Sequence, residues 1–128
     1  MADYTSIDNA ELYFQCKTYT GDGNDNRAIT FDGSEDMQPN FLWFKNTGAT
    51  AWHNIYDSVR GANKAIASNA NNGEESRSDT LDSFDSDGFT VGNDTSQSPN
   101  GLNTNASTNT YVCWAWKEAP LPNWTLPV

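Results

Sequence analysis

Acidic side chains are the most abundant groups in this sequence that could do chemistry, with 17 Asp and Glu residues against seven Lys and Arg. Glycoside hydrolysis needs two carboxyl groups about 5–9.5 Å apart across a cleft, one of them with a raised pKa. Most of the acidic residues here stand in segments rich in Gly, Asn and Ser, which are typical of solvated turns. We therefore expect structural and solubility roles for them.

A nucleophilic site would have to combine His53, the only histidine, with Cys16 or Cys113. Both cysteines lie in strand-like segments, and no neighbouring residue indicates an activated thiol. Two cysteines and one histidine are also too few for the usual four-ligand zinc site. The sequence predicts a protein that is not an enzyme and that holds no cofactor.

Calcium is the one metal that the sequence admits, at two acidic turns. The first turn begins like a calcium-binding loop, but Arg27 stands where such a loop has glycine and Gly33 where it has its terminal glutamate. The second turn precedes Gly88. The candidate ligands are Asp22, Asn24 and Asn26 in the first turn and Asp82, Asp85 and Asp87 in the second. We favour the alternative interpretation that both are ordinary hairpin turns.

Arginine and tryptophan side chains are the remaining binding candidates. Arg60 lies between Asp57 and Gly61, so it forms either a structural ion pair with Asp57 or an anion-binding site. Trp52 and Trp124 are able to stack on a sugar ring or to pack in a core or interface. We favour the ion pair and the packing roles, and keep Trp52 and Arg60 as candidate contacts to a carbohydrate or partner.

The formal net charge is −10, which excludes several classes of partner. Phosphate backbones and anionic membranes repel such a surface, so we expect no nucleic-acid binding and no membrane insertion. The N-terminal sequence lacks the basic and apolar segments of an export signal, and no apolar run approaches the ~20 residues of a membrane span. We therefore expect synthesis in a cytoplasm and, because cytosolic disulfides are rare, reduced and largely buried Cys16 and Cys113.

Turn-forming residues and a 12% aromatic content favour strands over helices. The main strands are predicted at residues 13–20, 41–46, 80–84, 88–92 and 110–117, with shorter ones at 27–31 and 52–56. The Asp87-Gly88 pair predicts the tight turn of a hairpin. Residues 57–69 form either a short helix or an irregular strand, and residues 93–109 form a long loop.

Short strands separated by turns predict an all-β fold, an antiparallel β-sandwich or jelly roll in a single domain. The predicted organisation has an N-terminal arm at residues 1–12, the sandwich at 13–117 and a Pro- and Trp-containing tail at 118–128. The tail carries three prolines, so we expect it to be extended rather than paired within a sheet.

Five blocks of the sequence, in order, are similar to a known family. They are KTYTG at 17–21, MQPNFLWFKN at 37–46, DSVRG at 57–61, SFDSDGFTVG at 83–92 and TYVCWAWK at 110–117. Together they resemble an uncharacterised phage-associated module of lectin-like β-sandwich type, found in virion and tail-fibre proteins of marine and cyanobacterial phages. The family pattern has Lys-Asn-Arg where this sequence has Lys45-Asn46-Thr47.

The resemblance implies a structural role on a virion surface. One hypothesis is a capsid decoration, cement or head-fibre subunit that contacts other virion subunits. The other is a tail-fibre or tail-tip module that binds a host-surface glycan. The sequence has no repeat or heptad segment typical of a long shaft, which favours decoration. We expect a homo-oligomer, with Leu121, Trp124 and Leu126 of the tail contacting a partner subunit.

Overall fold

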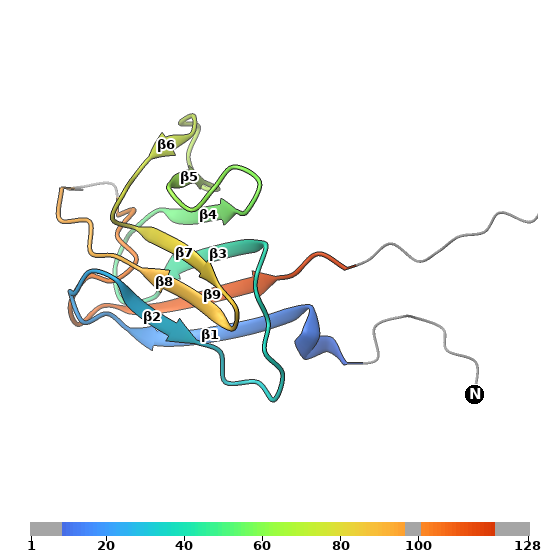
Figure 1. The fold of residues 1–128 in the computed structure, drawn as a ribbon. Coiled ribbons are helices and arrows are strands. Elements are labelled where there is room, and N and C mark those ends of the chain that lie inside the picture. The colour runs from blue at the N-terminus through green and yellow to red at the C-terminus, as the bar shows by residue number, and fades with distance from the viewer. Residues whose placement is uncertain (1–8, 97–100, 120–128) are drawn as a thin grey trace, which may run out of the picture.

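Two antiparallel sheets packed face to face make up the computed structural model, which describes residues 9–96 and 101–119 (Figure 1). The large sheet has six strands in the order β1 (Phe14–Thr20), β9 (Thr110–Trp116), β3 (Phe41–Asn46), β4 (His53–Asp57), β5 (Lys64–Ala67) and β6 (Glu75–Ser76). The small sheet has three strands in the order β2 (Arg27–Thr30), β8 (Gly88–Val91) and β7 (Leu81–Asp85). The predicted all-β sandwich is confirmed.

Helical structure is confined, among the described residues, to the short 3-10 helix η1 (Ala10–Leu12). Nothing in that part of the chain is a helix long and apolar enough to cross a membrane. Residues 57–69 contain a turn followed by β5, so the short-helix alternative for this segment was wrong. The positive φ of Gly61, 104°, explains why the apolar residues around it do not continue as a helix.

The central strands of the large sheet carry apolar side chains on both faces. In β3, Leu42 and Phe44 are 0% and 1% exposed, whereas Phe41 and Trp43 on the opposite side are half-buried. Successive side chains of a strand point to opposite faces of the sheet. We call the face toward the small sheet the inner face and the other the outer face.

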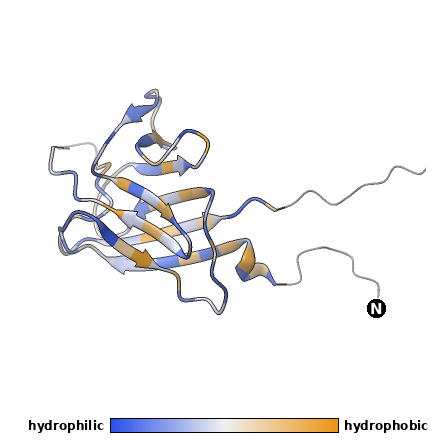
Figure 2. Cartoon of the chain, viewed as in Figure 1, coloured by the Kyte–Doolittle hydropathy of each residue, from blue (hydrophilic) through white to orange (hydrophobic). Residues whose placement is uncertain are grey.

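The core lies between the inner face and the small sheet. Phe44 packs edge-on against Phe89 of β8 with 5.1 Å between ring centroids, and against Tyr56 of β4 at 5.8 Å. Ile29 and Val91 complete this contact from the small sheet. Hydrophobic residues occur in the strands of both sheets, whereas the loop between β2 and β3 is largely hydrophilic (Figure 2). Burying one hydrophobic side chain fully stabilises the fold by roughly 1.5–3 kcal/mol.

Strands β7 and β8 form the predicted hairpin. Gly88 has a φ of 124°, and a Cβ atom there would lie 2.0 Å from the carbonyl oxygen of Ile29 in β2. Glycine is needed both for the turn and for the close approach of the two strands. Each main strand is found within one residue of the bounds predicted from the sequence.

Residues 101–109 are part of the packed structure, although their composition predicts only a loop. Leu102 is 1% exposed, and its carbonyl oxygen accepts a hydrogen bond of 2.9 Å from Asn54 Nδ2. Asn105 is fully buried and donates through Nδ2 to Asp22 Oδ1 and to the Asn24 carbonyl oxygen, both at 2.7 Å. These buried amides tie the segment before β9 to the turn after β1.

The predicted boundary of the N-terminal arm lies within the folded structure. Glu11 Oε2 accepts hydrogen bonds from the Ser34 amide at 2.8 Å and from Ser34 Oγ at 2.7 Å, and Asn9 Nδ2 donates to Glu35 Oε1 at 3.2 Å. Residues 9–12 therefore pack on the loop between β2 and β3. Residues 1–8 lie outside the described part of the chain.

Candidate functional site on the outer face of the large sheet

Aromatic residues from three neighbouring strands form the outer face. Phe14 of β1 is directly opposite Trp116 of β9, which is in turn opposite Phe41 of β3. Two residues farther along each strand, on the same face, Trp114 of β9 is opposite Trp43 of β3. This second row continues through Ile55 in β4 to Ile66 in β5. We call Phe14, Phe41, Trp43, Trp114 and Trp116 the aromatic patch.

The rings of the aromatic patch contact one another at steep angles. Phe14 and Trp116 have centroids 5.1 Å apart and planes inclined by 53°, and Phe41 meets Trp116 at 5.3 Å and 70°. Trp43 and Trp114 lie 5.8 Å apart at 60°. Phe14 and Trp116 remain 39% and 38% exposed. The patch is therefore a corrugated apolar surface, open to solvent at its edge.

A shallow depression lies next to the second aromatic row. Its lining residues are Trp43, Lys45, His53, Trp114 and Trp116. The Lys45 ammonium group donates to the Asn46 carbonyl oxygen at 2.6 Å, and His53 lies opposite Lys45 on the neighbouring strand. The depression thus has a floor of indole rings, with the polar side chains of Lys45 and His53 at one end.

Asp57 is the only carboxylate among the outward-facing residues of β1, β9, β3, β4 and β5. Its Oδ2 accepts from Arg60 Nε at 2.5 Å, and its Oδ1 accepts from the Arg60 amide at 2.9 Å. Burial alone would raise the pKa of Asp57, but these hydrogen bonds and the Arg60 charge hold the pKa below its usual value. Arg60 therefore makes the structural ion pair expected from the sequence.

In the first acidic turn the residues Asp22, Asn24 and Asn26 are exposed, and the Asp22 carboxylate is occupied by hydrogen bonds within the protein. Asp22 Oδ1 accepts from the Asn24 amide at 2.9 Å and from Asn105, while Asp22 Oδ2 lies 3.4 Å from Arg27 Nε. Asn26 adopts a positive φ of 56°, as expected in a tight turn. The arrangement is that of a hydrogen-bonded turn closed by an arginine.

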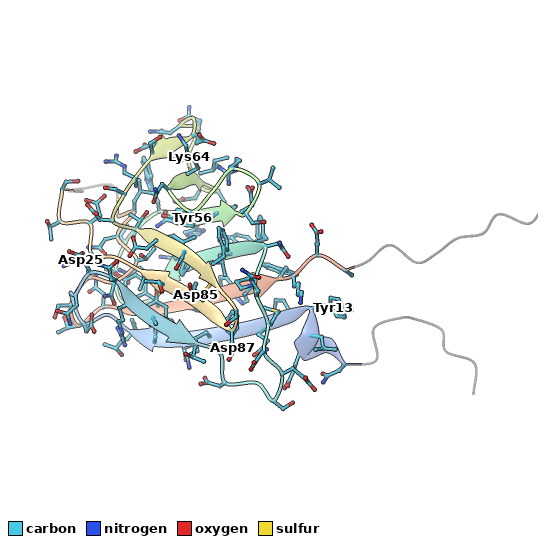
Figure 3. All side chains as sticks on the ribbon, in the orientation of Figure 1. Tyr13, Asp25, Tyr56, Lys64, Asp85 and Asp87 are labelled. Atoms are coloured by element: carbon cyan, nitrogen blue, oxygen red, sulfur yellow. The ribbon has the colours of Figure 1, made fainter. Side chains whose placement is uncertain are left out.

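The three candidate ligands of the second acidic turn, Asp82, Asp85 and Asp87, do not converge on one point. Asp85 accepts from Ser83 Oγ at 2.6 Å and from Thr90 Oγ1 at 2.7 Å, whereas Asp87 Oδ1 accepts from the Met37 amide at 3.2 Å. Burial, and then the charges of Asp79 and Asp25, raise the pKa of Asp82. Asp25 and Asp87 lie at opposite ends of the small sheet (Figure 3). In the described ranges no three His, Cys, Asp or Glu side chains are grouped so as to hold a metal ion.

The cysteines and the histidine are not brought together. Cys16 and His53 are on β1 and β4, three strand spacings apart in the large sheet, which is about 14 Å. Cys113 is on the inner face, is 0% exposed, and burial raises the pKa of its thiol. Both thiols are free, but Cys16 is exposed, so the prediction that both are buried was wrong for Cys16. Its side chain points to the outer face at the edge of the sheet.

Trp52 packs against the core, partly buried, rather than joining the aromatic patch. The predicted partner contacts Leu121, Trp124 and Leu126 lie outside the described residues. Sequence reasoning missed Trp43, Trp114 and Trp116 as candidate site residues. The signal that could have found them is the continuous apolar run in β3 and β9, because a strand covered on one face only should alternate with polar residues.

Comparison with known proteins gives one match. A family described as a domain of unknown function, DUF7483, matches residues 9–123. The chain belongs to this family. Searches of curated proteins and of solved structures give no significant match. The matched range begins at the first residue that the structure describes, in agreement with the packing of residues 9–12 on the domain.

Proposed function

We propose that this domain is a non-enzymatic structural module of a phage virion that attaches to another virion subunit through its aromatic patch. The five sequence blocks that resemble the phage-associated module support the virion setting. The patch supports the mode of attachment, because contiguous exposed apolar surface on a soluble domain marks an interaction site.

The composition of the patch favours a protein partner. Tryptophan is enriched among the residues that carry most of the energy of protein interfaces, and charged residues are depleted at interface centres. Although the chain has a net charge of −10, Asp57 is the only outward-facing carboxylate on these five strands, and Arg60 neutralises it. The inclined rings also present ridges and hollows, which suit interlocking side chains better than a flat polysaccharide surface.

The test is incorporation into particles. In a phage that encodes this chain, the double variant Trp114→Ser, Trp116→Ser should fold but should be lost from purified virions, as measured by quantitative mass spectrometry. Val59→Ser is the matched control, because Val59 is a 92% exposed apolar residue in the turn after β4, outside the patch. Full occupancy of the double variant, or absence of the wild-type chain from virions, would contradict the proposal.

The tail is the second proposed contact with the partner. Leu121, Trp124 and Leu126 are apolar residues in a proline-rich segment that follows β9, the strand carrying Trp114 and Trp116. Burying one tryptophan and two leucines could contribute several kcal/mol at about 25 cal/mol per Å², before the cost of ordering the segment. A chain ending at Ala119 should therefore fold and show reduced occupancy on virions.

A host-surface glycan is the alternative ligand, favoured by the depression beside Trp43 and Trp114. One sugar ring could stack on an indole there while Lys45 and His53 contact its hydroxyl groups. Screening the purified domain against a glycan array, with Trp43→Ala and Val59→Ser in parallel, separates the two functions. Binding of a defined glycan that only Trp43→Ala abolishes would favour the receptor-binding role over decoration.

A further inference from the structure

The two edges of the large sheet differ in length and in charge. One edge is β6, which has only two residues. Beside it, Glu75 forms an ion pair with Arg77, and Lys64 donates a hydrogen bond to Ser76 Oγ. The other edge is β1, which has seven residues, no acidic residue and no proline. Tyr13 and Lys64 mark these opposite edges (Figure 3). Short and charged edges resist pairing with other chains, whereas β1 is long and carries a single charged residue, Lys17, so it is the edge more open to pairing.

The hydrogen-bonding pattern shows which groups of β1 are available. Lys117 donates to the Tyr13 carbonyl oxygen and Gly21 donates to that of Asn109, so the odd-numbered residues of β1 bond to β9. In an antiparallel pair the intervening residues direct N–H and C=O away from the partner strand. The residues of β1 directed to the open edge are therefore Phe14, Cys16, Thr18 and Thr20, and the Thr20 carbonyl oxygen accepts a hydrogen bond of 2.5 Å from Arg27 Nη1. The amide and carbonyl groups of Phe14, Cys16 and Thr18 have no partner among the described residues.

The space beside this edge is open. Two adjoining grooves, which share Asp32, run along β1 between residues 14–20 and the segment 27–33. Strand β2 crosses in front of β1, at the edge of the small sheet (Figure 1). An added strand can therefore approach the main chain of β1 over its whole length.

We propose that β1 is a strand-pairing site for a second copy of this chain, so that two large sheets join as one continuous antiparallel sheet across a two-fold axis. The register centred on Cys16 uses both main-chain groups of Phe14, Cys16 and Thr18: Phe14 pairs with Thr18 of the other copy, and Cys16 with its own equivalent. Three pairs that exchange two hydrogen bonds each give six bonds. This inference does not depend on what the aromatic patch binds.

Charge and symmetry select this occupant and this register. Lys17 is the only charged residue of β1, and centring on Cys16 places it opposite Gln15 of the other copy instead of opposite its own equivalent. An acidic peptide would add attraction only at Lys17, which already pairs with Asp32. A two-fold contact is self-complementary and needs only one surface patch. Because the axis is perpendicular to the sheet, the two aromatic patches face the same side and lie next to each other.

Removing one outward amide tests the pairing. Thr18→Pro deletes an N–H that β9 does not use, and proline is tolerated at such positions on edge strands. The purified wild-type chain and the control Thr18→Ser should sediment as dimers, and Thr18→Pro should raise the dimer Kd about tenfold or more. Cys16→Lys, which places two ammonium groups face to face at the axis, should do the same without touching the main chain. A wild-type monomer at all concentrations, or dimers that both variants leave unchanged, would overturn the proposal.

Oxidation reports the register. Directly opposed residues of a hydrogen-bonded pair have Cα atoms about 5.5 Å apart, within the 4.4–6.8 Å range of disulfides. Treatment with copper phenanthroline in air, which accepts the two electrons of the two thiols, should crosslink the wild-type dimer at alkaline pH, where the exposed Cys16 thiol ionises. Cys16→Ser should abolish the crosslink and Cys113→Ala should retain it. A crosslink that survives Cys16→Ser would contradict this register.

Discussion

The two faces of the large sheet use the same strands for different purposes. In β9, Cys113 and Ala115 are 0% exposed and face the small sheet, whereas Trp114 and Trp116 alternate with them on the outer face. The inner face is filled by residues of both sheets, and its packing stabilises the fold. The outer face carries the aromatic patch and stays partly open. The comparison teaches that the sheet carries more apolar surface than its own fold requires, and we attribute the excess to binding.

The largest difference between the faces should appear in matched phenylalanine truncations. Phe44→Ala removes an inner ring that contacts Phe89 and Tyr56, and should lower the free energy of unfolding by about 3–5 kcal/mol. Phe14→Ala removes an outer ring that is 39% exposed, and should lower it by about 1 kcal/mol. Urea denaturation measures both. Equal losses would show that the outer face belongs to the core as much as the inner face does.

The second difference should appear in binding. Once the partner subunit has been identified by crosslinking in virions, Trp116→Ser should weaken attachment about 30-fold or more, the size of effect expected when a central interface residue is truncated. Its effect on the free energy of unfolding should stay near 1 kcal/mol. Surface plasmon resonance measures the affinity for the partner, and thermal denaturation of the same preparation measures the stability. A large loss of stability without a loss of affinity would show that Trp116 belongs to the core and not to a binding surface.

The third difference concerns the lone carboxylate of the outer face. Because its pKa is depressed in the folded state, Asp57 contributes stability that is fully present above its usual pKa of 3.8 and is lost as pH falls through the depressed value. Asp57→Asn should therefore be less stable than the wild type at neutral pH and equally stable at strongly acidic pH. Calorimetric Tm values across this pH range test it. A difference that persists in acid would assign the effect to packing, not charge.

The smallest effect should have the opposite sign and come from the small sheet. The raised pKa of Asp82 means that its ionised form is disfavoured in the folded state, so it costs stability as pH rises from 3.8 through the raised value. Asp82→Asn keeps an oxygen acceptor and should slightly raise the Tm at neutral pH, with no gain at strongly acidic pH. Asp36→Asn is a matched control, because Asp36 is an exposed aspartate of the β2–β3 loop. A lower Tm for Asp82→Asn at neutral pH would contradict the interpretation.

Much of the fold could be predicted because local patterns and final structure agree. The Asp-Gly turn, the alternation in β1 and the short apolar runs of β3 and β9 each determine a strand or turn without help from distant residues. The segment before β9 could not be predicted, because Leu102 and Asn105 are buried by partners far away in the sequence. The composition of such a segment does not indicate that its residues are buried.

The candidate site was harder to predict than the fold. Trp52 and Trp124 were the tryptophans considered for binding, with packing in a core or interface favoured for both. Packing of this kind does not say on which face of a two-sided strand a ring lies. Cys16 illustrates the same problem. Its alternation with Gln15 and Lys17 was visible and places its thiol on the face opposite theirs. The edge position of β1, which leaves that thiol without a neighbouring strand on one side, follows only from the strand order.

The strand order also constrains how the chain acquires its structure during synthesis. β9 is the last of the described strands along the chain, yet it lies between β1 and β3, so these three strands of the large sheet cannot assemble before Trp116 has left the ribosome. Until then β3 can pair with β4 but not with β9, so one edge of β3 and the side chains of Trp43 and Phe44 lack their neighbours from β9. Such a nascent chain is a candidate for chaperone binding, because exposed apolar strands aggregate. Synthesis rate after β8, rather than the stability of the finished domain, should then limit its yield.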